Sequence, residues 1–399
     1  MITYDIKKHT QDILEENNIL IIQDIDGVCI PLVKDPLKRE ISLNYINSAS
    51  RLVDKFFVLT CGEHEGRRGV NRIIERTLKS IKEPHEKGLY LPGLAGCGVE
   101  FQDRYGNNKI LGLGKDEIDF LKKVPDRMYK LLFNELIRIF PKESSNRIKE
   151  LCNVAICDTR FTPTLNLNEI LILADKNIEL QKELQNMMLK IMEKLINYTK
   201  NTNLENSFQL HMMPNLGVKG GKEILKESTI KDIGTTDIQF IINGAIKEAG
   251  LLVLLNKYLK VKKNIYPFGE DFNVRDCPRS HKELLKLCKE KISLNDMPML
   301  IGVGDTVTSE WNSETNNYQR GGSDRGFLTL IKELGEIYNT NNKVIFVNSS
   351  NSQVKRPRLS NLNSSGITDK DDNLKIDIVI EEGPSQYINW FEMISNNKC

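Results

Sequence analysis

The chain has 399 residues, of which 40% are hydrophobic and 28% charged, a composition typical of a globular protein with room for several domains. Its 56 Lys and Arg against 54 Asp and Glu give a formal charge of +2, which offers no case for nucleic acid as a main partner. The polar start and the lack of an apolar run of membrane length predict no signal peptide and no membrane partner.

Eight cysteines are spread along the chain without a Cys-x-x-Cys pair or the spacing of a zinc site. This usage predicts reduced thiols and therefore a cytoplasmic protein.

The first part of the chain predicts alternating helices and strands. The expected elements are a helix over 1–17, a strand over 18–23, a helix over 41–53, a strand over 55–60, a helix over 68–81, and a strand with a hairpin over 88–106. The apolar run at 19–22 is too short for a membrane span and suits a buried parallel strand. This order predicts an α/β fold with a doubly wound, mostly parallel sheet.

The pattern changes after residue 112. The expected elements are helices over 116–140 and 178–198 and strands over 152–157, 170–174 and 207–214. We therefore expect an inserted α+β domain over residues 113–207, with a core built from 1–112 and 208–399.

The sheet pattern resumes in the last part of the chain. The expected elements are helices over 223–227, 240–259, 281–291 and 323–338 and strands over 299–305, 343–347 and 376–380. Residues 348–373, rich in Ser and Asn, predict a mobile surface loop.

Two carboxylates, Asp24 and Asp26, follow the first buried strand at its carboxyl end, where open α/β sheets bind ligands. Acidic side chains this close repel one another unless a cation lies between them, so the pair predicts a metal-assisted site. A turn followed by a helix cap is the competing interpretation of the same two residues.

A third acidic residue, Asp305, follows a later strand and completes a candidate phosphoryl-transfer site. Asp24 can attack phosphorus to form an aspartyl-phosphate, and Asp26 can protonate the leaving group and then take a proton from water. Mg²⁺ prefers hard oxygen ligands, which Asp24, Asp305 and the backbone carbonyl of Asp26 can supply.

Two further side chains are candidates for binding the phosphoryl oxygens. Thr60 follows the second buried strand, and Lys219 precedes Gly220 near an expected helix start. Lys222 competes with Lys219 for this role.

These motifs resemble those of the haloacid dehalogenase-like phosphatases. The matching positions are Asp24-Ile-Asp26-Gly, Thr60, Lys219-Gly220 and Gly304-Asp305, the four motifs in order. The resemblance implies Asp24 as nucleophile, Asp26 as general acid and base, and magnesium bound by Asp24, Asp305 and the Asp26 carbonyl. It also implies that the inserted domain is a C2-type cap.

Four longer stretches resemble the cyanobacterial glucosylglycerol-phosphate phosphatases, also called salt-tolerance phosphatases; they are residues 94–101, 213–222, 302–311 and 320–327. The resemblance implies hydrolysis of glucosylglycerol 3-phosphate to the compatible solute glucosylglycerol, an osmoprotectant, and phosphate. Activity on sucrose or trehalose phosphate stays open, as does a non-catalytic sugar-phosphate sensor. An association with the glucosyltransferase that makes the substrate also stays open, since no residue pattern identifies it.

The chain departs from related sugar phosphatases at Ser309, where an Asp is often found. Glu310 or Asp324 is expected to substitute for it near the metal. The long segment between Lys219 and Asp305, including residues 229–297, is expected to widen the pocket, cover a sheet edge or form a subunit contact.

Overall fold

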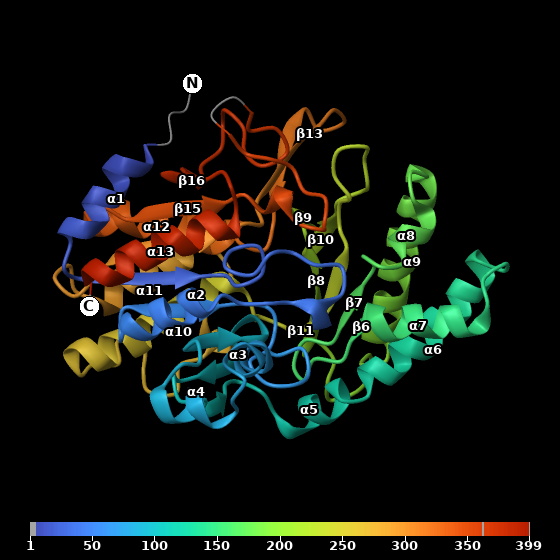
Figure 1. Ribbon diagram of the computed structural model, residues 1–399, viewed down its shortest axis with the longest axis horizontal. Helices are drawn as coiled ribbons and strands as arrows, with labels where there is room; N and C mark the ends of the chain where they lie inside the picture. Colours follow the sequence, from blue (N-terminus) through green and yellow to red (C-terminus); the bar gives the residue numbers. More distant parts are fainter. Residues whose placement is uncertain (1–4, 361–362, 399) are drawn as a thin grey trace.

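The computed structural model describes residues 5–360 and 363–398. An eight-stranded sheet with helices on both faces forms one part, and a four-stranded sheet with its own helices forms a second part beside it (Figure 1). We call the second part the cap lobe. Among the described residues, no helix is both long and apolar enough to cross a membrane.

Six strands of the large sheet run parallel, and two antiparallel strands complete one edge. The strand order is β16 (Ile378–Ile380), β15 (Lys343–Val347), β12 (Met299–Gly304), β1 (Ile19–Gln23), β2 (Phe56–Leu59), β3 (Gly93–Ala95), β4 (Glu100–Gln102), β5 (Asn108–Ile110). The predicted doubly wound, mostly parallel α/β fold is confirmed.

Strand β1 lies inside this sheet and is buried on both faces. Ile19 and Ile21 belong to one hydrophobic cluster, whereas Leu20 and Ile22 belong to the other. Successive side chains of a strand point to opposite faces, so an unbroken apolar run is what a strand between two helical layers requires.

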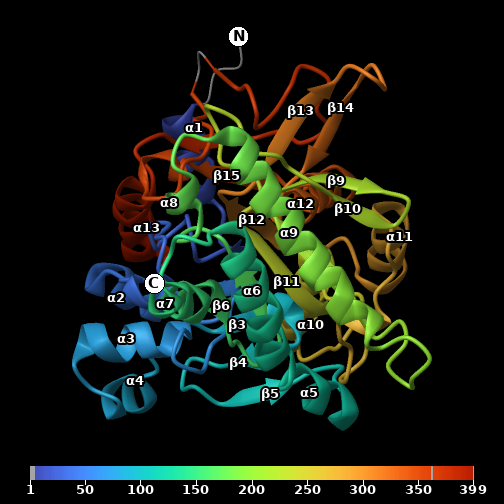
Figure 2. The ribbon, with the colours of Figure 1, turned by 90° about the vertical axis from the view of Figure 1, so that its right-hand side faces the viewer.

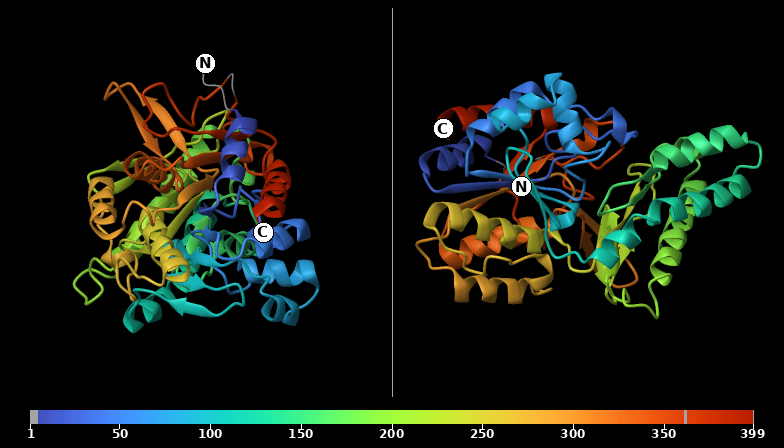
Figure 3. Two further views of the ribbon diagram at one scale, coloured as in Figure 1. Left: turned by 90° about the vertical axis from the view of Figure 1, so that its left-hand side faces the viewer. Right: turned by 90° about the horizontal axis from the view of Figure 1, so that it is seen from below.

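Helices cover the two faces of the large sheet in separate layers, seen above and below it in the right panel of Figure 3. One layer contains α1 (Ile6–Glu15), α2 (Leu43–Arg51), α3 (Val70–Leu78) and α13 (Pro384–Lys398). The other contains α10 (Lys247–Lys263), α11 (His281–Lys291) and α12 (Arg325–Tyr338). The short helix α4 (Lys82–Lys87) follows α3.

The cap lobe is built on an antiparallel sheet with the order β6 (Ile156–Cys157), β7 (Thr164–Asn166), β11 (Asp237–Ile242), β8 (Phe208–Met213). Its helices are α5 (Lys115–Leu121), α6 (Val124–Ile139), α7 (Ser145–Ala155), α8 (Leu171–Ala174) and α9 (Ile178–Asn197). Figure 2 shows α6 and α9 in front of this sheet. Two hairpins, β9 (Asn215–Lys219) with β10 (Lys222–Leu225) and β13 (Thr308–Asn312) with β14 (Asn317–Gly321), complete the strands.

The expected end of the insert at residue 207 is too early for this sheet, because β8 and β11 pair with each other and β11 pairs with β7. Residues 152–155 belong to helix α7 and residues 171–174 to helix α8, where the sequence predicts strands. The helix expected over 223–227 is wrong, as is the start of the one expected at 240, since β10 and β11 occupy these positions.

The segment after β15 is packed rather than a mobile surface loop in its described part. Val354 and Leu359 are buried, and Arg320 and Arg325 pair with Asp369 and Asp372. Residues 361–362 lie outside the described residues. The few apolar residues of this mostly polar segment, and its acidic side chains, make tertiary contacts that composition does not reveal.

The prediction that the cysteines are reduced is wrong for one pair of them, because a disulfide joins Cys61 and Cys97. The backbone N–H of Cys97 donates to the carbonyl of Thr60, which brings the two segments together across 36 positions. The free cysteines among the described residues are buried, and Cys399 lies outside those residues.

Candidate active site

Three neighbouring strands deliver polar side chains to one edge of the large sheet. Asp24 follows β1, Thr60 follows β2 and Asp305 follows β12, and β1 lies between the other two strands. Because parallel strands end at the same edge, the three residues meet although they are far apart in sequence. All three residues are buried.

The turn after β1 requires a glycine. Gly27 has a φ of +81°, and a Cβ atom built there would lie 2.0 Å from Oδ2 of Asp305. The missing side chain therefore lets the turn that carries Asp24 and Asp26 approach Asp305.

Three buried carboxylates form the centre of the site. One oxygen each from Asp24, Asp305 and Asp324 lie within 4.8 Å of one another. Asp324 stands at the start of α12 and accepts hydrogen bonds of 2.9 Å from the backbone N–H groups of Asp305 and Thr306. Burial raises the pKa of Asp24 and of Asp305, and the neighbouring carboxylates raise both further.

A buried lysine, Lys247, contacts two of these carboxylates. Its Nζ lies 2.6 Å from Oδ2 of Asp24 and 2.6 Å from Oδ1 of Asp324. Burial lowers the pKa of Lys247, but the charges of Asp24 and Asp324 outweigh burial and hold that pKa above its ordinary value. One ammonium against three carboxylates leaves an excess of negative charge, and three buried oxygen donors suit a hard divalent cation.

Asp26 lies beside this centre and is paired with an arginine. Its Oδ2 is 2.8 Å from Nη1 of Arg39, while Nη2 of Arg39 donates to the carbonyl oxygen of Arg68. The Asp26 side chain is 33% exposed, so it remains open to the pocket. Arg39 thus fixes the position of a carboxylate that can exchange a proton with a bound molecule.

Thr60 presents its hydroxyl at the start of the loop after β2. Its Oγ1 accepts a hydrogen bond of 3.1 Å from the N–H of Gly62. With that acceptor site occupied, the hydroxyl proton is available to a ligand oxygen.

Lys219 and Lys222 lie outside the pocket and are exposed. They face each other across the β9–β10 hairpin, and the Nζ of Lys222 lies 3.2 Å from Glu193. Gly220 and Gly221 both have positive φ, which closes a two-residue hairpin where the sequence predicts a helix start.

Lys247 is the lysine that sequence reasoning missed. It begins helix α10 directly after strand β11, and Gly244 precedes it in the turn. A lysine at the start of an apolar helix that returns to the sheet was the available signal.

Of the two expected substitutes near the metal, the structure brings only Asp324 to the carboxylate centre. Glu310 instead lies 2.6 Å from the buried Nζ of Lys226, on the β13–β14 hairpin. Ser309 donates to Asp369 and so supports the same hairpin.

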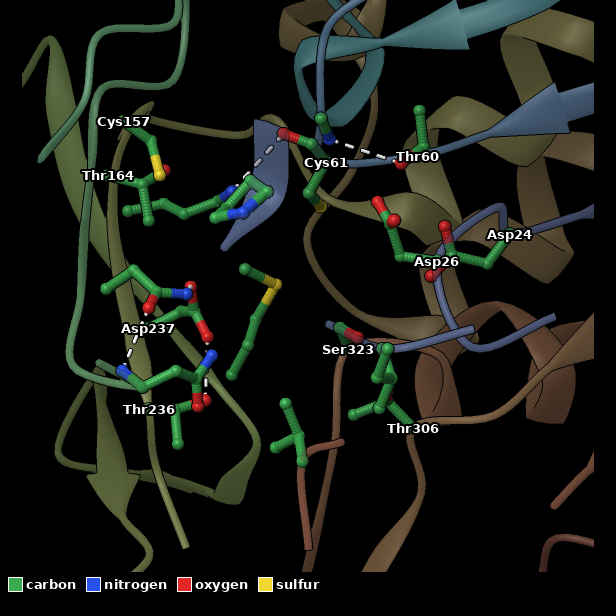
Figure 4. A pocket seen from close by; sticks show the side chains of 18 of the residues that line it. Asp24, Asp26, Thr60, Cys61, Cys157, Thr164, Thr236, Asp237, Thr306 and Ser323 are labelled. Carbon is green, nitrogen blue, oxygen red and sulfur yellow. Dashed lines mark hydrogen bonds between the residues drawn. The ribbon is translucent and has the colours of Figure 1, made fainter. Parts of the chain in front are cut away.

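Asp24, Asp26, Thr60 and Lys247 line one wall of a pocket that lies between the large sheet and the cap lobe. Figure 4 shows Asp24, Asp26 and Thr60 on the core side and Thr164, Thr236 and Asp237 on the cap side. Two carboxylates, an ammonium and a hydroxyl converge there, a set of groups that can carry out phosphoryl transfer through a covalent intermediate.

Comparisons with known proteins agree on one family. Residues 18–395 match the family described as glucosylglycerol-phosphate phosphatase. The glucosylglycerol-phosphate phosphatase of Synechocystis sp. is 37% identical to this chain over 97% of the chain and 95% of its own length.

The solved structures that resemble the chain are more distant. The C-terminal domain of trehalose-6-phosphate phosphatase from C. albicans has 13% identity and a TM-score of 0.46, covering 98% of this chain and 96% of its own. The Aspergillus fumigatus trehalose-6-phosphate phosphatase has 9% identity and a TM-score of 0.40, covering 98% and 97%. From the family match and the 37% identical relative, the chain belongs to the glucosylglycerol-phosphate phosphatase family.

Proposed function

We propose that this chain hydrolyses glucosylglycerol 3-phosphate to glucosylglycerol and phosphate, in the cytoplasm, as a step of compatible-solute synthesis. The observation that carries the proposal is the contact of Lys247 with Asp24 at the point where three parallel strands end. The name of the Synechocystis relative supports this substrate.

In the first step, the Asp24 carboxylate attacks the phosphorus atom of the ester. A phosphorus–oxygen bond forms at Asp24, the bond to the sugar alcohol breaks, and Asp26 gives a proton to the departing alkoxide. In the second step, water attacks the aspartyl-phosphate and loses a proton to Asp26. Phosphate leaves and the carboxylate of Asp24 is restored.

Lys247 and Thr60 have the supporting roles in both steps. The ammonium of Lys247 stands beside Asp24 and neutralises charge that builds on the phosphoryl oxygens. The Thr60 hydroxyl donates to one of those oxygens and holds the group in line with Asp24.

A divalent cation fits the carboxylates of Asp24, Asp305 and Asp324, with the Asp26 carbonyl as the further expected ligand. We propose Mg²⁺, which supplies charge neutralisation to the phosphoryl group when bound.

The test compares phosphate release by the purified protein from glucosylglycerol 3-phosphate, sucrose 6-phosphate and trehalose 6-phosphate in the presence of Mg²⁺. We expect the highest kcat/KM for glucosylglycerol 3-phosphate, by at least about tenfold, since a site built for one set of hydroxyls rejects others. Equal values for the three esters would contradict the assignment of substrate.

A non-catalytic sugar-phosphate sensor is the alternative of a different class. It would bind the ester without releasing phosphate from it. The assembled Asp24, Lys247 and Asp26 favour catalysis, since binding alone needs no nucleophile beside the phosphate.

A further inference from the structure

The cap wall of the pocket carries four polar side chains in register. Strands β7 and β11 pair antiparallel, with Thr164 opposite Gln239 and Asn166 opposite Asp237. Residues two apart on a strand share a face, so the four side chains form one patch. All four line the pocket, and Figure 4 shows Thr164 and Asp237 across it from Asp24.

The two walls of the pocket differ in charge. Among the described lining residues, those from segments 157–168 and 213–239 include hydroxyls, amides and one carboxylate, but no Lys, Arg or His. The described lining residues of the core carry charges of both signs, with Lys247, Arg39, Arg68 and Arg356 against Asp24, Asp26 and Glu63. The core wall therefore suits a phosphate, whereas the cap wall suits a neutral group rich in hydroxyls.

Asp237 is held in place and keeps hydrogen-bonding capacity. Its Oδ1 accepts from Nδ2 of Asn166 at 2.6 Å, and its Oδ2 accepts from Oγ1 of Thr236 at 2.7 Å. Nη2 of Arg356 in turn donates to Oγ1 of Thr236 at 3.0 Å. Each carboxylate oxygen can accept a second hydrogen bond, so two acceptor positions remain for a ligand.

Gln239 is fixed from the core side. Its Nε2 donates to the carbonyl of Cys61 at 3.3 Å. The patch is therefore bound to the residue that follows Thr60 in the chain. This contact sets the separation between the polar patch and Thr60, the residue before Cys61.

We propose that Asp237, Asn166, Gln239 and Thr164 form the subsite that binds the hydroxyl groups of the neutral sugar leaving group. This inference rests on the proposed function and assigns the residues that determine which sugar alcohol the site accepts as the leaving group. Asp237 accepts from sugar hydroxyls, while the fixed carboxylate repels leaving groups that carry their own negative charge.

The experiment measures kcat/KM for glucosylglycerol 3-phosphate and for glycerol 3-phosphate, which lacks the glucose ring, in the wild type and in Asp237→Ala. The ratio of the two values should fall about 10- to 100-fold in the variant, because hydrogen bonds from the sugar to a charged group are lost. Thr164→Val, which removes only a hydroxyl, should lower the same ratio by a smaller factor.

Asp116→Ala is the matched control. Asp116 accepts a hydrogen bond of 2.8 Å from Asn203, so it forms the same kind of carboxylate–amide pair on the exposed side of the cap lobe. The ratio should stay within about twofold of the wild type in this variant. If Asp237→Ala does not fold, Asp237→Asn, which keeps the volume, takes its place.

The outcomes separate the two proposals. A wild type that shows no preference for glucosylglycerol 3-phosphate would overturn the proposed function. If the wild type prefers glucosylglycerol 3-phosphate and the Asp237 variants keep the same ratio of kcat/KM values, the proposed subsite is wrong but the proposed function stands. A fall in the ratio confined to the patch variants supports the subsite.

Discussion

Lys247 contacts both Asp24, the proposed nucleophile, and Asp324 in the acidic centre. We predict that Lys247→Met lowers kcat by at least about 100-fold, because a preorganised positive group is lost from the transition state. Phosphate release at saturating Mg²⁺ and substrate measures the effect, and circular dichroism checks the fold. Lys219→Met, at the exposed hairpin, should stay within about twofold of the wild type. Equal losses in both variants would contradict the assignment of Lys247.

The buried side chain of His64 makes the free energy of unfolding depend on pH, independently of the carboxylates in the site. Burial lowers the pKa of His64 from 6.5 to about 4, although its ring nitrogen Nε2 donates to the carbonyl of Gly93. Between these values the unfolded chain binds a proton that the folded chain does not, so stability is lost as the pH falls.

We predict that His64→Gln, which keeps a donor toward Gly93, removes this loss. From about pH 7.5 to about pH 5, the free energy of unfolding should fall by roughly 2 kcal/mol more in the wild type than in His64→Gln. Urea unfolding at the two pH values measures it. Parallel pH profiles would show that His64 does not titrate with a shifted pKa.

The turn after β1 is the element on which the geometry of the site depends. We predict that Gly27→Ala lowers kcat by more than about tenfold and weakens Mg²⁺ activation, because the new Cβ would collide with Asp305 at a positive φ. Gly269→Ala is the control, since Gly269 has a φ of +105° and a Cβ added there would meet no atom within 4 Å. Its activity should not change, and a similar loss in both variants would assign the effect to backbone strain alone.

The core strands could be predicted because their apolar runs are unbroken, and with them the positions of Asp24, Thr60 and Asp305 at strand ends. The role of Lys247 could not be predicted, because its position depends on where the chain returns from the cap lobe to the core. A run such as 171–174 suits a buried helix as well as a strand, so periodicity does not separate the two. The Gly220-Gly221 pair carries a hairpin signal, but the expected helix just beyond it favoured a phosphate-binding role for Lys219 instead.

At the scale of the whole molecule, the segment after β15 connects the core to the cap lobe through Arg356, which lies beside the pocket. Arg356 follows β15 in the chain and donates to the carbonyl of Gly234 at 2.9 Å as well as to Thr236. The pairing of β11 with β7 is another long-range contact of this kind, which is why the extent of the cap sheet could not be predicted from local pattern.

We predict that Arg356→Ala loosens this connection. Two hydrogen bonds from a charged group are lost, so amide hydrogen exchange over residues 230–236 should become at least about tenfold faster. KM for the sugar phosphate should rise as well, since Thr236 supports Asp237. The exposed neighbour Arg358→Ala serves as control. Unchanged exchange in Arg356→Ala would show that the cap lobe is held by other contacts.

In the proposed mechanism, Asp24 carries the phosphoryl group during turnover. The most direct measurement is to mix the protein with glucosylglycerol 3-phosphate and Mg²⁺, quench in acid within one turnover, and locate phosphate by peptide mass spectrometry. We predict phosphate on the peptide that contains Asp24 in the wild type and none on that peptide in Asp24→Asn. Turnover without phosphate on Asp24, or phosphate on another residue, would contradict the role of Asp24 as the nucleophile.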